Sequence, residues 1–126
     1  MSTPDYYKYD DGETHFECFD ISRYFSGDWA QVIQYVFRWQ KKGGVEDLKK
    51  ALACAKDAYY NGLAAEPITK SRTLCRAVNS KIRVLGENNF SNASKIWESF
   101  ITFYEGADVT IDALEKMIKD AQNETV

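Results

Sequence analysis

The chain has 126 residues, of which 44% are hydrophobic and 28% are charged. This length predicts a single domain. The composition excludes a disordered chain and, because no apolar run is long enough to span a bilayer, a membrane-spanning one. The formal net charge of -3 argues against a protein that binds duplex nucleic acid.

The charges are unevenly distributed along the chain. Residues 1–28 and 98–126 each carry seven acidic and two basic side chains, whereas residues 67–97 carry one acidic and six basic ones. Residues 29–66 carry four acidic and six basic side chains. A basic middle between two acidic ends predicts that positive potential is concentrated on one surface.

The cysteines and the N-terminal sequence bear on the compartment. Cys18, Cys54 and Cys75 are odd in number and widely spaced, which indicates neither a disulfide framework nor a zinc site. The first residues, MSTPDYYKYDDG, are polar and acidic and do not resemble a signal peptide. We therefore expect a cytoplasmic protein.

The first half of the chain predicts an arm and a helical hairpin. Residues 1–27 suit an N-terminal arm with a short helix, and residues 1–20 suit either a small β-hairpin or an extended arm. Residues 28–61 suit two helices. The first runs from about residue 28 to 42, ends at Gly43-Gly44, and buries Trp29, Val32, Ile33, Val36 and Phe37. The second begins at Glu46 and Asp47, whose carboxylates suit the positive end of a helix, ends at Asn61-Gly62, and buries Leu48, Ala51, Leu52, Ala55 and Tyr59.

Residues 69–124 predict the C-terminal helices. Thr69 or Ser71 caps the first, which Gly86 ends and which buries Leu74, Ala77, Val78, Ile82 and Leu85. Ser91 caps the next, which Gly106 ends and which buries Ala93, Ile96, Trp97, Phe100, Ile101 and Tyr104. Thr110 caps the last, which carries Leu114, Met117, Ile118 and Ala121. Short loops favour antiparallel neighbours, so we expect an all-α fold: an irregular antiparallel bundle of four main helices with a short N-terminal arm, forming an oligomer.

The common catalytic and metal-binding motifs are missing. The sequence has no phosphate-binding glycine loop, no H-E-x-x-H and no nucleophile elbow. The single histidine, His15, suits an exposed polar position in the arm. The predicted core stripes contain no carboxylates, so we expect no metal site and no cofactor.

Two predicted helices carry a basic face. Gln31, Tyr35, Arg38 and Lys42 recur at helical spacing, with Trp39 and Lys41 beside them, which suits a base and its phosphates. Cations near a helix C-terminus also complement the helix dipole, so a purely structural role stays open.

The second basic face contains three arginines. Arg72, Arg76, Asn79 and Arg83 recur at helical spacing, with Lys70 and Lys81 nearby. Like charges on one face repel unless an anion neutralises them. The anion is either a phosphate ligand or an acidic segment of the same chain or of a second subunit.

The aromatic residues divide into two groups. Trp29 and Trp97 lie in register with aliphatic stripes, which predicts core positions. Tyr6, Tyr7 and Tyr9 have no helical core face, so they either stack on a ligand or dock the arm onto the bundle.

Three segments, TPDYYKY, FECFDISRYF and QVIQYVFRWQKKGGVEDLKKAL, resemble a small family of proteins encoded largely by tailed phages and labelled nucleotide kinase-like or SaV-like. The resemblance covers residues 3–60. Glu17 and Asp20 fit the family's acidic pair, and Pro4 and Tyr7 fit its opening motif. The most specific positions are Tyr35, Arg38, Lys42, Gly43, Asp47, Leu48, Lys50 and Ala51.

The resemblance implies a phage or prophage origin, hence the host cytoplasm, and a nucleotide ligand. The family label implies phosphoryl transfer, which needs phosphate clamps and a group that orients the nucleophile. Here Thr3 and Tyr6 stand where the family tends to have histidines, Ala30-Gln31 replaces Gly-Asn, and Gln34 replaces lysine. These departures favour capture of a nucleotide without turnover.

Three functions follow from these observations. The first is an oligomeric, phage-type sponge that sequesters a nucleotide, including a cyclic or signalling nucleotide of host immunity, as an anti-defence protein. Its candidate ligand-binding residues are Tyr7, Tyr35, Arg38, Trp39, Lys41, Lys42, Arg72, Arg76 and Arg83, and we expect the ligand between subunits. The second is a nucleoside monophosphate kinase-like phosphotransferase, with Glu17 or Asp20 as the orienting base. The third is a protein–protein interaction module whose basic helix meets an acidic partner.

Overall fold

The computed structural model describes residues 3–101 and 106–123. A 3-10 turn, η1 (Asp5–Tyr7), precedes a hairpin of β1 (Lys8–Asp10) and β2 (His15–Glu17). The helices of the described residues follow in the order α1 (Phe19–Ser22), α2 (Gly27–Arg38), α3 (Val45–Tyr60), α4 (Arg72–Glu87), a 3-10 turn η2 (Phe90–Asn92), α5 (Ser94–Ile101) and α6 (Gly106–Asn123). The expected predominantly helical fold is confirmed. No helix in these ranges is both long and apolar enough to cross a bilayer.

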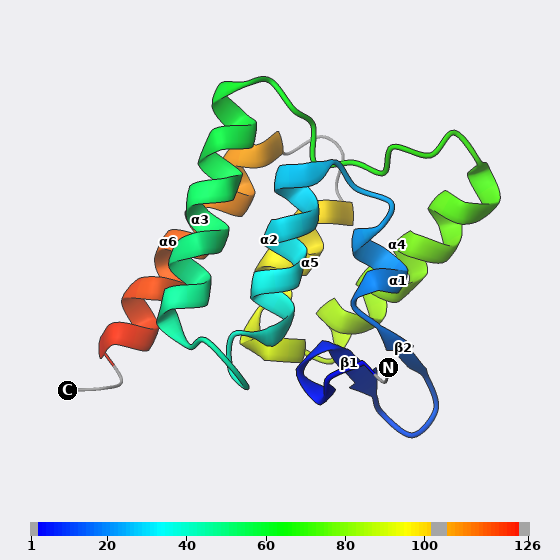
Figure 1. Cartoon of the computed structure of the whole chain (residues 1–126), viewed down its shortest axis with the longest axis horizontal. Helices are drawn as coiled ribbons and strands as arrows, with labels where there is room; N and C mark the ends of the chain where they lie inside the picture. The colour runs from blue at the N-terminus through cyan, green and yellow to red at the C-terminus, as the bar shows by residue number, and fades with distance from the viewer. Residues whose placement is uncertain (1–2, 102–105, 124–126) are drawn as a thin grey trace.

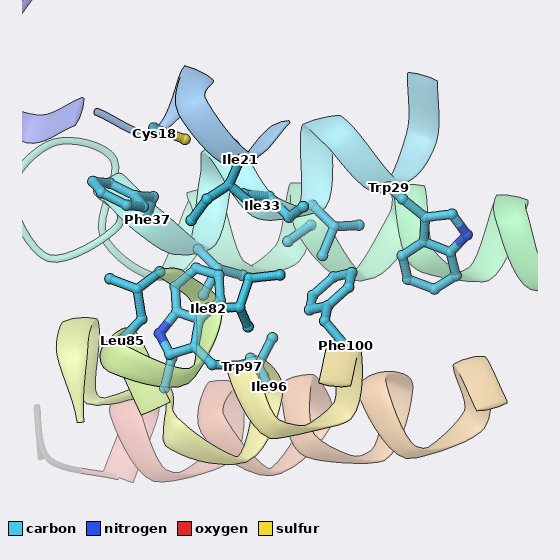
Figure 2. Close-up of a cluster of buried hydrophobic side chains, with 14 of the residues drawn as sticks. Cys18, Ile21, Trp29, Ile33, Phe37, Ile82, Leu85, Ile96, Trp97 and Phe100 are labelled. Atoms are coloured by element: carbon cyan, nitrogen blue, oxygen red, sulfur yellow. The ribbon is translucent and has the colours of Figure 1, made fainter. Parts of the chain in front are cut away.

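Helix α2 lies at the centre of the molecule, with α3 along one side and α6 packed on α3 (Figure 1). Helices α4 and α5 pack against each other, and α1 lies beside α2. The core between them contains Ile33 and Phe37 of α2, Ile82 of α4, and Phe100 of α5 (Figure 2). The apolar stripes of the sequence therefore meet in one core.

The two tryptophans expected in the core are confirmed there. Trp29 and Trp97 are both 0% exposed. Each indole N–H donates to a backbone carbonyl, Trp29 to Leu63 at 3.0 Å and Trp97 to Phe90 at 2.9 Å. Their burial therefore leaves no indole donor unpaired.

The arm forms a small hairpin, one of the two alternatives that the sequence left open. Tyr9 of β1 pairs with Phe16 of β2, and both side chains are buried. The Tyr9 hydroxyl accepts a hydrogen bond from Asn88 Nδ2, directly after α4, at 2.6 Å. The hairpin is thus docked on the C-terminal end of α4. Docking of the arm is confirmed for Tyr9.

Helix α2 ends four residues earlier than expected, at Arg38 rather than Lys42. Residues 39–44 form consecutive turns, in which Gly44 N donates to Trp39 O at 2.7 Å. Gly44 has φ +59°, a left-handed conformation that suits glycine. Lys41 and Lys42 therefore lie in a turn and do not continue the face of Tyr35.

The expected caps at Ser91 and Thr110 were wrong, whereas Ser71 does cap α4, accepting from Leu74 N at 3.3 Å. Ser91 lies within η2, and its hydroxyl donates to Phe37 O at 2.8 Å. Thr110 lies inside α6, where its hydroxyl is hydrogen-bonded to Ser99 Oγ at 2.7 Å. Both hydroxyls are buried, so a partner from another element satisfies each of them in place of a helix N–H group.

One helix-breaking glycine and two apolar positions also differ from expectation. Gly86 lies inside α4, whereas Gly106 is the first residue of α6. Tyr59 and Leu74 are 50% and 39% exposed, because each lies in the terminal turn of its helix. Tyr104 lies outside the described residues.

Candidate ligand-binding surface

Arg38 and Asp47 form a buried ion pair between α2 and α3. Arg38 Nε donates to one Asp47 carboxylate oxygen at 3.0 Å, and the Arg38 NH2 group donates to the other at 3.1 Å. Asp47 is 1% exposed. The sequence predicted that its carboxylate lies at the exposed start of a helix, whereas in the structure it is the buried partner of Arg38. The hydrogen bond to Asp47 raises the pKa of Arg38, outweighing the opposite effect of partial burial. Arg38 is therefore fully charged and held in one orientation.

Gly43 completes the surroundings of the Asp47 carboxylate. Its amide donates to Asp47 Oδ2 at 3.0 Å. A Cβ atom at position 43 would overlap the Asp47 carboxyl group. Only glycine allows the backbone to approach this closely, which explains physically why glycine suits position 43, directly after Lys42.

The arm tyrosines join the same cluster. Tyr7 OH accepts a hydrogen bond from the Arg38 NH1 group at 3.0 Å. Tyr6 touches Tyr7 edge-on, with ring centroids 4.8 Å apart. The Lys42 ammonium lies 4.7 Å from the Tyr6 ring centroid and 3.1 Å from its hydroxyl. Turn residue Lys42 is thus brought to the arm.

Tyr35 contacts two cations from different helices. Arg38 Cζ is 5.0 Å from its ring centroid, and Lys50 Nζ of α3 is 5.8 Å away. Both distances fit cation–π contacts. We call this cluster the tyrosine–cation surface; it consists of Tyr6, Tyr7, Tyr35, Arg38, Lys42 and Lys50.

The charges of this surface are only partly neutralised. Three of the five N–H donors of Arg38 are used by Asp47 and Tyr7. Lys42 and Lys50 are exposed, and neither forms an ion pair with a carboxylate within residues 3–101 and 106–123. The neighbouring Lys49, in contrast, is paired with Glu46 at 3.5 Å. Within the described ranges, the surface therefore offers two ammonium groups that lie beside aromatic rings and have no carboxylate partner.

Two members of this surface were not among the predicted ligand-binding residues. Lys50 follows Asp47 by three positions, so both lie on the same side of α3. This three-residue spacing from Asp47 was the signal in the sequence that could have identified Lys50. Tyr6 could not be placed from the sequence, because its contact with Lys42 depends on how the arm docks.

Trp39 faces a different part of the molecule. Its indole N–H donates to Ser91 O at 2.6 Å, and its ring lines a cavity of about 660 Å³ beside α5 and α6. The charged residues that line the cavity are Lys95, Glu98, Asp112, Lys116 and Asp120. Three carboxylates against two ammonium groups do not favour a polyanion.

The other predicted basic residues are not gathered on the tyrosine–cation surface. Lys41 is exposed in the turn after α2. Arg72, Arg76 and Arg83 are exposed on α4, which packs mainly on α5 and α1. Gln31 of the predicted stripe accepts a hydrogen bond from Cys54 Sγ at 3.1 Å instead of joining Tyr35. The two basic faces are therefore separate surfaces built on different helices.

The candidate acid–base residues lie at the start of α1. Asp20 Oδ2 accepts a hydrogen bond from Glu17 N at 2.8 Å, so this carboxylate fixes the turn between β2 and α1. Arg23 lies 3.8 Å from the other Asp20 oxygen. His15 is exposed at the start of β2, as expected. Across the described ranges, no three His, Cys, Asp or Glu side chains are grouped as metal ligands would be.

Comparisons with known proteins name no relative. A scan against protein-family models finds no matching family, and searches of curated proteins and of solved structures find no match.

Proposed function

We propose that the tyrosine–cation surface binds a phosphate-bearing small molecule of the nucleotide class and that the protein captures this molecule without converting it. The observation that carries the proposal is the contact of the Tyr35 ring with both Arg38 and Lys50, with the Lys42–Tyr6 pair as a second aromatic–cation contact. Aromatic faces next to unpaired cations suit a base and its phosphates.

The residues have different roles in this proposal. Lys42 and Lys50 contact phosphate oxygens, since their ammonium groups have no carboxylate partner in the described chain. The rings of Tyr35 and Tyr6 stack on the base. Arg38 is a positioning residue: its bonds to Asp47 and Tyr7 hold the arm against α2, and two N–H donors stay available to the ligand.

Capture is favoured over phosphoryl transfer by the state of the carboxylates. A phosphotransferase needs a group that orients the nucleophile. Asp47 is engaged by Arg38 and Gly43, and Asp20 by the Glu17 amide and Arg23, so of the predicted pair only the Glu17 carboxylate could still supply this group. In the phage setting that the resemblance implies, capture would withhold a signalling nucleotide from a host effector.

Isothermal titration calorimetry with mono-, di-, tri- and cyclic nucleotides tests the proposal. We expect Lys50→Ala and Lys42→Ala each to weaken binding of the best ligand about tenfold, because each removes a charge-assisted contact. Lys49→Ala, one position away and paired with Glu46, is the matched control and should bind like the original chain.

Chromatography of the same mixtures separates capture from turnover. The released nucleotide should be unchanged, including when a monophosphate is mixed with a triphosphate donor. A new diphosphate would replace capture with phosphoryl transfer. If no nucleotide binds, or if the Lys49 control loses as much affinity as Lys50→Ala, the proposal is wrong.

A further inference from the structure

Helix α4 has an exposed basic face. Arg72, Arg76 and Arg83 follow one another at i, i+4 and i+11, and all three are exposed. None of them forms an ion pair with an acidic residue within 3–101 or 106–123. Neighbouring like charges on a helix are destabilising, so this face suits a partner that supplies negative charge. Among these residues, no acidic segment of the same chain neutralises the arginines.

Two apolar side chains near the start of α4 are also exposed. Leu74 continues the stripe of Val78 and Ile82, yet it is 39% exposed in the first turn of α4. Ile68, in the loop that leads to α4, is 64% exposed. Its amide donates to Tyr24 O at 2.7 Å, which holds the loop on the body of the molecule. Leu74 is two positions from both Arg72 and Arg76, so it lies on another side of α4, and the basic face itself consists of charged and polar side chains.

A complementary acidic surface exists on the same molecule, at the tip of the hairpin. Asp10, Asp11 and Glu13 are all exposed there, and none forms an ion pair within the described ranges. The amides of Gly12 and Glu13 donate to the Asp10 and Asp11 carboxylates, each at 2.9 Å. Hydrogen bonds from Tyr9, Thr14 and Glu13 lower the pKa of Asp11. The tip therefore presents fixed negative charges.

A molecule cannot bring its own hairpin tip to the start of its own α4. The hairpin is docked at the opposite end of this helix, through the Asn88–Tyr9 hydrogen bond, and it lies below the C-terminal end of α4 in Figure 1. Helix α4 has 16 residues, which at 1.5 Å per residue corresponds to about 24 Å. A contact between the two surfaces therefore needs two molecules.

We infer that the hairpin tip of a second copy of this chain docks on Arg72 and Arg76 of α4. Asp10, Asp11 and Glu13 of one copy neutralise these arginines of the other. Two copies can make this contact reciprocally in a two-fold dimer, or head-to-tail in a ring or filament. This inference does not depend on the nucleotide proposal.

A charge-swap experiment tests this assembly. Light scattering coupled to size exclusion should give a mass above the monomer value of 14.5 kDa at low salt, and the mass should fall with added salt. The double variants Arg72→Glu/Arg76→Glu and Asp10→Lys/Glu13→Lys should each be monomeric. Mixed in equal amounts they should associate again, because each supplies the charge that the other lacks.

The matched control is Lys95→Glu/Lys119→Glu, which makes the same change in net charge on α5 and α6 and should assemble like the original chain. Circular dichroism confirms that each variant is folded. The inference is overturned if the original chain is monomeric at low salt and high concentration, or if Arg72→Glu/Arg76→Glu assembles normally. If Arg72→Glu/Arg76→Glu lost nucleotide binding but assembled like the original chain, the inference would also be overturned, since these arginines would then bind the ligand.

Discussion

Asp47 is the residue on which the tyrosine–cation surface depends. Its carboxylate accepts hydrogen bonds from Arg38 and from the amide of Gly43, and it is removed from water. A buried charge is tolerated only when it is paired and hydrogen-bonded. The conformation of the 39–44 turn, the orientation of Arg38 and the docking of Tyr7 are therefore linked to this single carboxylate.

Gly43→Ala should disturb this centre by steric overlap alone. The added methyl group would meet the Asp47 carboxyl group, and overpacking of this kind costs about 1–3 kcal/mol. Urea denaturation should show this loss of unfolding free energy. Gly27→Ala is the matched control: a Cβ there meets nothing within 4 Å, so its stability should be unchanged or higher by up to about 1 kcal/mol. Equal effects of the two substitutions would contradict the role of Gly43.

At the scale of elements, α2 and α3 also interact at the end of the helix pair opposite to Arg38. Asp28 in the first turn of α2 and Asp57 near the end of α3 interact. A hydrogen bond shared with Asp57, then burial, then the charge of Asp57 raise the pKa of Asp28. Cys54 lies close to both carboxyl groups, and burial together with their charges raises the pKa of its thiol. Two carboxylates repel each other at this end of the pair at neutral pH.

The pH dependence of stability follows from the direction of this shift. Because the pKa of Asp28 is higher in the folded than in the unfolded protein, the folded protein binds the proton more tightly. This contribution is present at acidic pH and is lost as the pH rises through the raised pKa. Asp57→Asn removes the repulsion, so its melting temperature at neutral pH should exceed that of the original chain. The difference should shrink as the pH falls toward about 4. An equal difference at both pH values would contradict the Asp28–Asp57 interaction.

The helices could be predicted from the sequence, and the details of their ends could not. The stripes Trp29–Phe37 and Val78–Leu85 specify the buried faces directly, because a period of 3.6 residues reflects burial. Ser91 and Thr110 have the residue type and position of caps, yet Phe37 O and Ser99 Oγ, both distant in the chain, bind their hydroxyls. Likewise Asp47 was expected at an open helix end, and only tertiary packing shows that Arg38 covers it.

At the scale of the whole molecule, the predicted ligand-binding residues lie on more than one surface. Tyr35, Arg38 and Lys42 do come together, whereas Trp39 faces the cavity beside α5 and α6. The direction of Trp39 depends on where α2 ends, since one residue beyond the last turn of a helix no longer follows its periodicity. The arginines of α4 are positively charged like Lys42, but they lie on a different surface. The sequence therefore predicted two basic faces on two helices, but not the direction of Trp39 or the contacts that complete the tyrosine–cation surface.

The two surfaces should act independently. Arg72→Glu/Arg76→Glu, which we expect to abolish assembly, should bind nucleotide with the same affinity as the original chain, because neither residue contacts the tyrosine–cation surface. Lys50→Ala should conversely keep the original mass in light scattering while binding weakens. Parallel loss of affinity and assembly in either variant would show instead that one composite site spans two subunits.

Trp39 gives the protein a built-in optical reporter. Trp29 and Trp97 are both 0% exposed, while Trp39 is half-buried at the edge of the cavity. A collisional quencher such as acrylamide therefore reaches Trp39 first in the native state, and the quenched fraction of the emission comes from the residue directly after Arg38. Opening of the 39–44 turn can thus be distinguished from global unfolding by fluorescence alone, without a label.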